Sequence, residues 1–163
     1  MRENREFDQL EEVFDVDGML GRLAKWLRIL GFDTICPCKR HSESHYFVTA
    51  NKKVRDPRAI IVQGSEIFEQ LRDVLEAAHL SPRAELVLSR CLMCNIPVTE
   101  VSKDEVRGRV PARIYEAHAL FRECARCGRV YWEGSHFERI KMSLQKNGIS
   151  GIPPCEVEPE QKI

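Results

Sequence analysis

The sequence predicts an α/β domain built on a parallel sheet, followed by a small metal-binding module. In the first half of the 163-residue chain, short apolar stretches typical of strands alternate with amphipathic stretches typical of helices. In the second half, two Cys-x-x-Cys pairs occur in a chain of seven cysteines whose first residues do not resemble an export signal. This context favours metal ligation over disulfides.

The elements of the first half follow from hydrophobic periodicity. Residues 13–17 are expected to form the first strand, because Phe14 and Val16 alternate with aspartates. A helix is expected over residues 18–30, where leucines recur at helical spacing and Gly31 is suited to end the helix. Further strands are predicted over residues 32–36, 46–49 and 59–63, and a second helix over residues 65–79.

The second half has shorter elements. One more strand is expected over residues 86–88. Ser102 and Glu105 have the spacing of a capping box, which predicts a short helix there. A last helix is expected over residues 135–147, with Ser135 as its N-cap.

The two Cys-x-x-Cys pairs predict a zinc site. Two residues between cysteines allow a tight turn to direct both sulfurs at one ion, and Gly128 suits the left-handed position after the second pair. Four thiolates leave no coordination position for water, so the site would be structural. The 29-residue spacer between the pairs is long enough to carry its own helix. The predicted ligands are Cys91, Cys94, Cys124 and Cys127.

Four more metal-capable residues lie between the second and third expected strands. They are Cys36, Cys38, His41 and His45. Two interpretations stay open, namely a second metal site and an ordinary loop.

The charge balance limits the classes of function. Lys and Arg number 25, as do Asp and Glu, which excludes a protein that coats nucleic acid by bulk charge. The zero net charge hides basic regions over residues 21–58 and 89–146, and the 17 arginines suit contact with phosphate. No apolar run approaches the ~18 residues of a membrane span, and a cytoplasmic location is expected.

Two regions carry a more specific resemblance. They are the run from Phe14 to Asp33 (FDVDGMLGRLAKWLRILGFD) and the pair formed by RCLMCN, from Arg90, and CARCGRVYWEGSH, from Cys124. Together they resemble the PIN-like RNase family named after the C-terminal domain of the Mut-seven exonucleases. In prokaryotes this family stands alone as a PIN-like α/β domain with a zinc ribbon.

The resemblance covers roughly residues 12–146 and implies a domain organisation. A PIN-like domain would span residues 12–85, and a zinc ribbon with a terminal helix would span residues 86–148. Residues 1–11 would form a disordered extension and residues 149–163 a loose tail.

The resemblance also implies a ribonuclease that uses Mg²⁺ or Mn²⁺ bound by carboxylates at the carboxyl ends of the strands. Asp17 and Asp33 match acidic positions of the family. Asp17 has a second interpretation as the cap of the following helix. Asp15 is unusual within a central parallel strand and suggests that this strand is partly exposed.

The sequence departs from the family between its second and fourth strands. Residues 36–45 are too few for the usual acid-bearing crossover helix, so the domain is expected to be truncated. Thr49-Ala-Asn51 replaces the family's Thr-Arg-Asp motif, and an amide takes the place of a carboxylate. Glu43 and Asp56 lie nearby as alternative acids.

The first functional hypothesis is therefore a metal-dependent ribonuclease with a depleted acidic site. Basic residues would hold RNA phosphates, namely Arg22, Lys25, Arg28, Lys52 and Lys53. The alternative is a catalytically inactive RNA-binding or adaptor module that uses the zinc ribbon, where Tyr131 and Trp132 either stack on bases or form ribbon core. An interaction domain without nucleic acid is a third interpretation.

Overall fold

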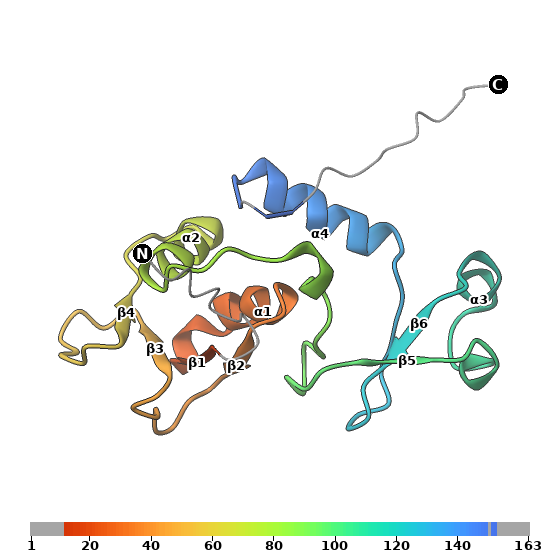
Figure 1. Cartoon of the computed structure of the whole chain (residues 1–163), viewed down its shortest axis with the longest axis horizontal. Coiled ribbons are helices and arrows are strands. Elements are labelled where there is room, and N and C mark those ends of the chain that lie inside the picture. Colours follow the sequence, from red (N-terminus) through yellow and green to blue (C-terminus); the bar gives the residue numbers. More distant parts are fainter. Residues whose placement is uncertain (1–11, 150, 153–163) are drawn as a thin grey trace, which may run out of the picture.

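A parallel sheet forms the centre of the computed structural model, which describes residues 12–149, 151 and 152 (Figure 1). Its strands are β1 (Val13–Val16), β2 (Asp33–Ile35), β3 (Tyr46–Thr49) and β4 (Ala59–Ile61), in the order β2-β1-β3-β4. All neighbouring pairs are parallel, so the carboxyl ends of the strands share one edge. The predicted α/β fold class is confirmed.

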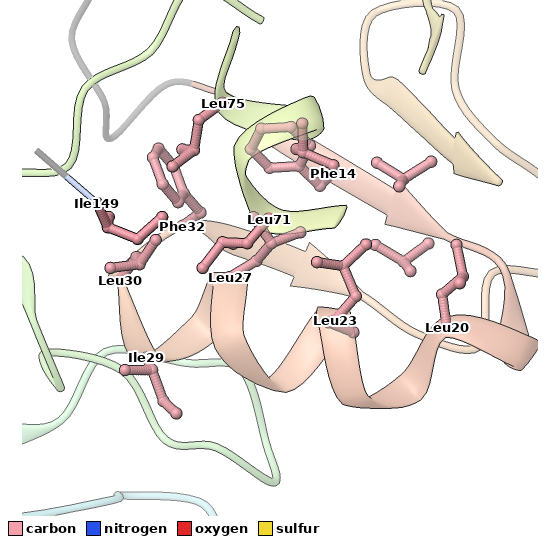
Figure 2. Close-up of a cluster of buried hydrophobic side chains, with 14 of the residues drawn as sticks. Phe14, Leu20, Leu23, Leu27, Ile29, Leu30, Phe32, Leu71, Leu75 and Ile149 are labelled. Atoms are coloured by element: carbon pink, nitrogen blue, oxygen red, sulfur yellow. The ribbon is translucent and has the colours of Figure 1, made fainter. Parts of the chain in front are cut away.

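Two helices cover one face of this sheet. A 3-10 turn (Gly18–Leu20) leads into α1 (Gly21–Ile29), and α2 (Ile67–Ala77) follows β4. Their apolar sides meet the sheet in one buried cluster, in which Leu27 and Leu71 contact the layer that contains Phe14 (Figure 2). The predicted leucine stripe of the first helix is buried, and Gly31 follows it with a φ of +92°.

The last helix, α4 (Ser135–Lys146), packs into the same cluster. Phe137, Ile140 and Leu144 are buried there together with residues of α1 and α2. A helix that follows the ribbon in sequence thus completes the core of the α/β part, because its apolar stripe has no comparable surface in the small ribbon. The domain boundaries inferred from the resemblance remain a prediction.

The second half contains a small antiparallel sheet at the opposite end of the molecule from β4 (Figure 1). Its strands are β5 (Thr99–Val101), β6 (Phe121–Glu123) and β7 (Val130–Tyr131). The helix expected within the cysteine spacer is present as α3 (Ala112–Ala117), beside a 3-10 turn (Asp104–Val106). Ser102 and Glu105 form the predicted capping box, with Glu105 Oε2 accepting from the Ser102 N–H at 2.8 Å.

Two local predictions were wrong. The strand expected over residues 86–88 is replaced by a 3-10 turn (Ala84–Leu86), and Leu88 has a left-handed φ of +57°, outside the β region. Ser135 does not cap α4, because Gly134 occupies the N-cap position and Ser135 is already helical. Within the part of the chain that the structure describes, no helix is both long and apolar enough to cross a membrane.

Candidate functional site

The four predicted cysteines converge in the ribbon. Their Sγ atoms all lie within 4.8 Å of one another, and those of Cys91 and Cys127 are 3.8 Å apart. A tetrahedral zinc ion with Zn–S bonds of about 2.3 Å needs sulfurs about 3.8 Å apart, so the cluster fits this ion. Gly128 has the expected left-handed φ, +67°.

Neighbouring donors prepare this cluster for a cation. The Tyr131 hydroxyl donates to Cys91 Sγ at 3.1 Å, and the Cys94 N–H donates to the same sulfur at 3.4 Å. Burial raises the pKa of Cys91, but these donors outweigh it and lower the pKa to about 6. Burial and the neighbouring thiols raise the pKa of Cys94 to about 12. Zinc binding would deprotonate both thiols, since a cysteine ligates a metal ion as the thiolate.

The carboxyl edge of the parallel sheet holds Asp17. This half-buried residue follows β1, and its Oδ2 accepts from the Thr49 hydroxyl at 3.0 Å. Its Oδ1 accepts from the Met19 N–H at 3.3 Å, which caps the 3-10 turn. Capping and a position at the carboxyl edge are therefore compatible. The role of Thr49 as partner was missed, although the last residue of a strand adjacent to β1 is where such a partner is expected.

Asp15 does not join Asp17, although both project from the same face of β1. Its side chain is buried, and its Oδ2 accepts from the Ser42 N–H at 2.8 Å and lies 3.1 Å from His45 Nδ1. As predicted, residues 36–45 form a loop without a helix. This loop covers the sheet at Asp15. The interpretation that Asp15 marks a partly exposed strand was wrong, because a polar loop replaces the apolar cover.

The alternative acids and the second metal set are dispersed. His41 Nε2 lies 2.8 Å from Asp56 Oδ2, while His45 faces Asp15, so the two histidines have different partners. Asn51 Oδ1 accepts from the Lys53 N–H at 3.0 Å within its own loop. Over residues 12–149, 151 and 152, the ribbon cysteines are the one group of three or more Cys, His or acidic side chains that converges as a metal site.

Asp33 lies at the other edge of the sheet. It begins β2, where it pairs with Val13 at the start of β1, so it does not meet Asp17. Its Oδ1 accepts from Asn95 Nδ2 at 2.7 Å, and its Oδ2 lies 3.5 Å from Arg90 Nη1. Asp33 thus joins the sheet to the first cysteine pair.

Of the five basic residues predicted to bind RNA, four are exposed and one is used structurally. Arg22 and Lys25 lie on the outer side of α1, and Lys52 and Lys53 lie in the loop after β3. The Arg28 guanidinium instead donates to the Thr34 carbonyl at 2.8 and 3.0 Å and to the Leu92 carbonyl at 2.9 Å. Arg28 therefore ties α1 to β2 and to the ribbon.

Comparison with known proteins agrees with this architecture. The family model described as "Mut7-C RNAse domain" matches residues 12–144, which is most of the chain. Neither the curated proteins nor the solved structures contain a match. The matched range takes in the parallel sheet, the four ribbon cysteines and nearly all of α4. The chain belongs to the Mut7-C RNAse domain family.

Proposed function

We propose that this protein binds RNA along the carboxyl edge of its parallel sheet and has lost the carboxylates needed for two-metal hydrolysis. The observation that carries the proposal is the separation of three aspartates, one in β1, one directly after β1 and one in β2. Asp17 is at the carboxyl edge, Asp15 is bonded to a covering loop, and Asp33 is bonded to Asn95 at the amino edge. Two-metal cleavage of a phosphodiester needs several carboxylates around ions about 4 Å apart.

Exposed basic residues support binding at this edge. Arg22 lies in the first turn of α1, which follows β1 after a 3-10 turn, and Lys25 is one turn further. Lys52 and Lys53 lie directly after β3, whose last residue contacts Asp17. The segments that follow two adjacent strands thus carry two pairs of exposed cations, which can contact successive phosphates.

The ribbon has a structural part in this proposal. Zinc on the four cysteines would hold the turn from which Leu92 and Asn95 contact the α/β part. Thiolate ligands of this kind persist in a reducing compartment, so the proposal places the protein in the cytoplasm.

Salt-dependent RNA binding tests the proposal. A fluorescein-labelled 12-nucleotide RNA would be titrated with zinc-loaded protein at several salt concentrations, with polarisation as the readout. For single strands the slope of log K against log salt is about −0.7 per phosphate contact, so replacing Lys52 and Lys53 by Gln should reduce the slope by about 1.4. The matched control replaces Arg83 and Lys146, exposed residues outside this edge, by Gln. Equal slopes for the two double variants would contradict the proposal.

A second candidate function, metal-dependent cleavage by Asp17, is favoured by the position of this carboxylate. Among the described residues its Oδ1 accepts from the Met19 N–H alone, at the long distance of 3.3 Å, which leaves acceptor capacity for a hard cation. Mn²⁺ binding measured by paramagnetic resonance on wild type and on Asp17→Asn separates the two functions. Mn²⁺ binding and RNA cleavage that are both lost in the variant would establish the enzyme. RNA binding without either would establish the binding module.

A further inference from the structure

An aromatic pocket lies where the ribbon meets α4. Two cavities share a wall made of Leu88, Tyr131, Trp132 and Phe137, and the larger has a volume of about 160 Å³. Apolar side chains line most of its surface, with Leu92 and Ile140 behind the aromatic rings. The other cavity is lined in addition by Leu120, by Arg122 and by two acids, Glu100 and Glu133.

The aromatic wall is held rigidly. The Tyr131 hydroxyl donates to Cys91 Sγ at 3.1 Å and accepts from the Leu92 N–H at 3.3 Å. These two hydrogen bonds to the first cysteine turn hold the tyrosine ring in place. The Trp132 indole lies against Gly134, where an added Cβ would be only 3.0 Å from Nε1. Glycine therefore permits this close approach, and both half-buried rings are set before a ligand arrives.

The rim of the pocket is charged. The Arg122 side chain is 40% exposed, and its guanidinium lies 3.8 Å from a Glu133 carboxylate, a loose ion pair that a stronger anion can replace. Leu120 is 65% exposed at the same mouth. Planar aromatic surface beside an accessible arginine is the combination that binds unpaired nucleotides, with the base on the ring and the phosphate on the cation.

We propose that this pocket takes one unpaired nucleobase of an RNA strand, stacked on Trp132, with Arg122 at the adjacent phosphate. The proposal rests on the RNA-binding function proposed above and adds a second contact, on the ribbon, to that at the sheet edge. An apolar peptide side chain would fill the same cavity but would make no use of the Arg122 guanidinium beside the adjoining cavity.

Tryptophan fluorescence can test the pocket separately from RNA binding as such. The chain has two tryptophans, and Trp26 packs on Phe68 with ring centroids 4.8 Å apart and lines neither cavity. Trp26→Phe keeps an aromatic ring there and leaves Trp132 as the reporter. This variant, loaded with zinc, would be titrated with fluorescein-labelled oligoadenylate of 12 nucleotides and with a fully abasic oligomer of the same length.

The expected result is a rise in polarisation with quenching of Trp132 by oligoadenylate, and about tenfold weaker binding of the abasic oligomer. Leu120→Glu places a negative charge at the pocket mouth and should weaken binding of oligoadenylate by a similar factor. The matched control is Met142→Glu, which makes the same change at an exposed residue of α4 outside the pocket lining.

Three outcomes would overturn the proposal. Equal affinity for the two oligomers without quenching would exclude the base pocket and leave the RNA-binding function in place. No polarisation change with either oligomer would remove the RNA-binding function and the pocket with it. Quenching by an apolar peptide but not by RNA would assign the pocket to a protein partner.

Discussion

Asn95 bonds the first cysteine pair to Asp33 of the parallel sheet. Its Nδ2 donates to Asp33 Oδ1 at 2.7 Å, and its Oδ1 accepts from the Thr34 N–H at 2.9 Å. Both polar atoms of one amide thus join segments more than 60 residues apart in the chain. The Asp33 carboxylate is in this way part of the contact between sheet and ribbon.

Replacing Asn95 should therefore lower the stability of the whole protein. Its φ of +64° favours Asn or Gly, so Asn95→Gly keeps the backbone conformation while it removes both hydrogen bonds. We expect Asn95→Gly to lower the free energy of unfolding by about 2 kcal/mol, since hydrogen bonds to charged groups contribute about 1.5–3 kcal/mol. Chemical denaturation followed by circular dichroism measures this loss, with the exposed neighbour Met93→Ala as control. A stability equal to wild type would show that the amide contacts contribute nothing.

Asp15 gives a second prediction, which separates structural from metal-binding acids. Asp15→Ala leaves the Ser42 N–H without its acceptor beneath the covering loop, and should cost about 1–3 kcal/mol of stability. The same change should leave any Mn²⁺ binding intact, whereas Asp17→Asn should remove it. Denaturation and paramagnetic resonance on the two variants check both halves. Loss of Mn²⁺ binding from a folded Asp15→Ala protein would show that Asp15 is a metal ligand.

The sequence predicts most of the parallel sheet because its signals there are local. Residues 46–49 coincide with β3, and alternation around Phe14 and the leucine stripe mark β1 and α1. The cysteine cluster is also predictable, because two short turns and one ion determine it. The strand predicted over residues 86–88 does not form, and Val87 and Leu88 pack against the main core cluster instead.

The acidic site could be predicted only in part. A pattern places an acid on a strand, but it does not reveal which groups from distant segments accept or donate a hydrogen bond to it. Asp33 meets Asn95 and Asp15 meets Ser42 across 62 and 27 positions, and neither contact has a periodic signature. The same limit applies to the prediction for Arg28. Its spacing from Lys25 indicates a basic helix face, but its guanidinium donates to backbone carbonyls of distant segments.

Leu144 of α4 offers a test of the shared core. The side chain is fully buried in the cluster that contains Phe14 and Leu71. Leu144→Ala should lower the free energy of unfolding by about 2–5 kcal/mol, from lost burial and the cavity that remains. Amide exchange should speed up in β1 and α2, far from the substitution in sequence. Exchange that increases only within α4 would show that this helix is not part of a cooperative core.

The hydrogen bond of the Tyr131 hydroxyl is expected to raise the affinity of the cysteine cluster for zinc. It donates to Cys91 Sγ, and such partners of metal ligands typically contribute 10–100-fold in metal affinity. Tyr131→Phe should therefore release zinc to a chelator about tenfold faster than wild type, and should shift the thiolate-to-metal absorption of the cobalt-loaded protein. Tyr115→Phe, which changes a ribbon tyrosine without a bond to sulfur, is the matched control. Identical release rates for the two variants would remove this role from Tyr131.

The ion pair of Glu123 with Arg109 makes the stability of the ribbon depend on pH, and the direction of the change follows from the pKa of Glu123. Arg109 Nη2 and Nη1 donate to the two oxygens of Glu123 at 2.6 and 3.1 Å, which lowers the pKa of this carboxyl below its ordinary value. A group whose folded pKa is depressed stabilises the protein above its unfolded pKa, about 4.3 for Glu, and loses that contribution as the pH falls through the folded value. The difference in unfolding midpoint between wild type and Glu123→Gln should therefore be largest at neutral pH and shrink below about pH 4.

Acid also protonates the cysteines and releases zinc, but this affects both proteins and cancels in the difference. Glu116→Gln, at an exposed position of α3, should show a small difference at every pH, and the same profile for both variants would refute the assignment.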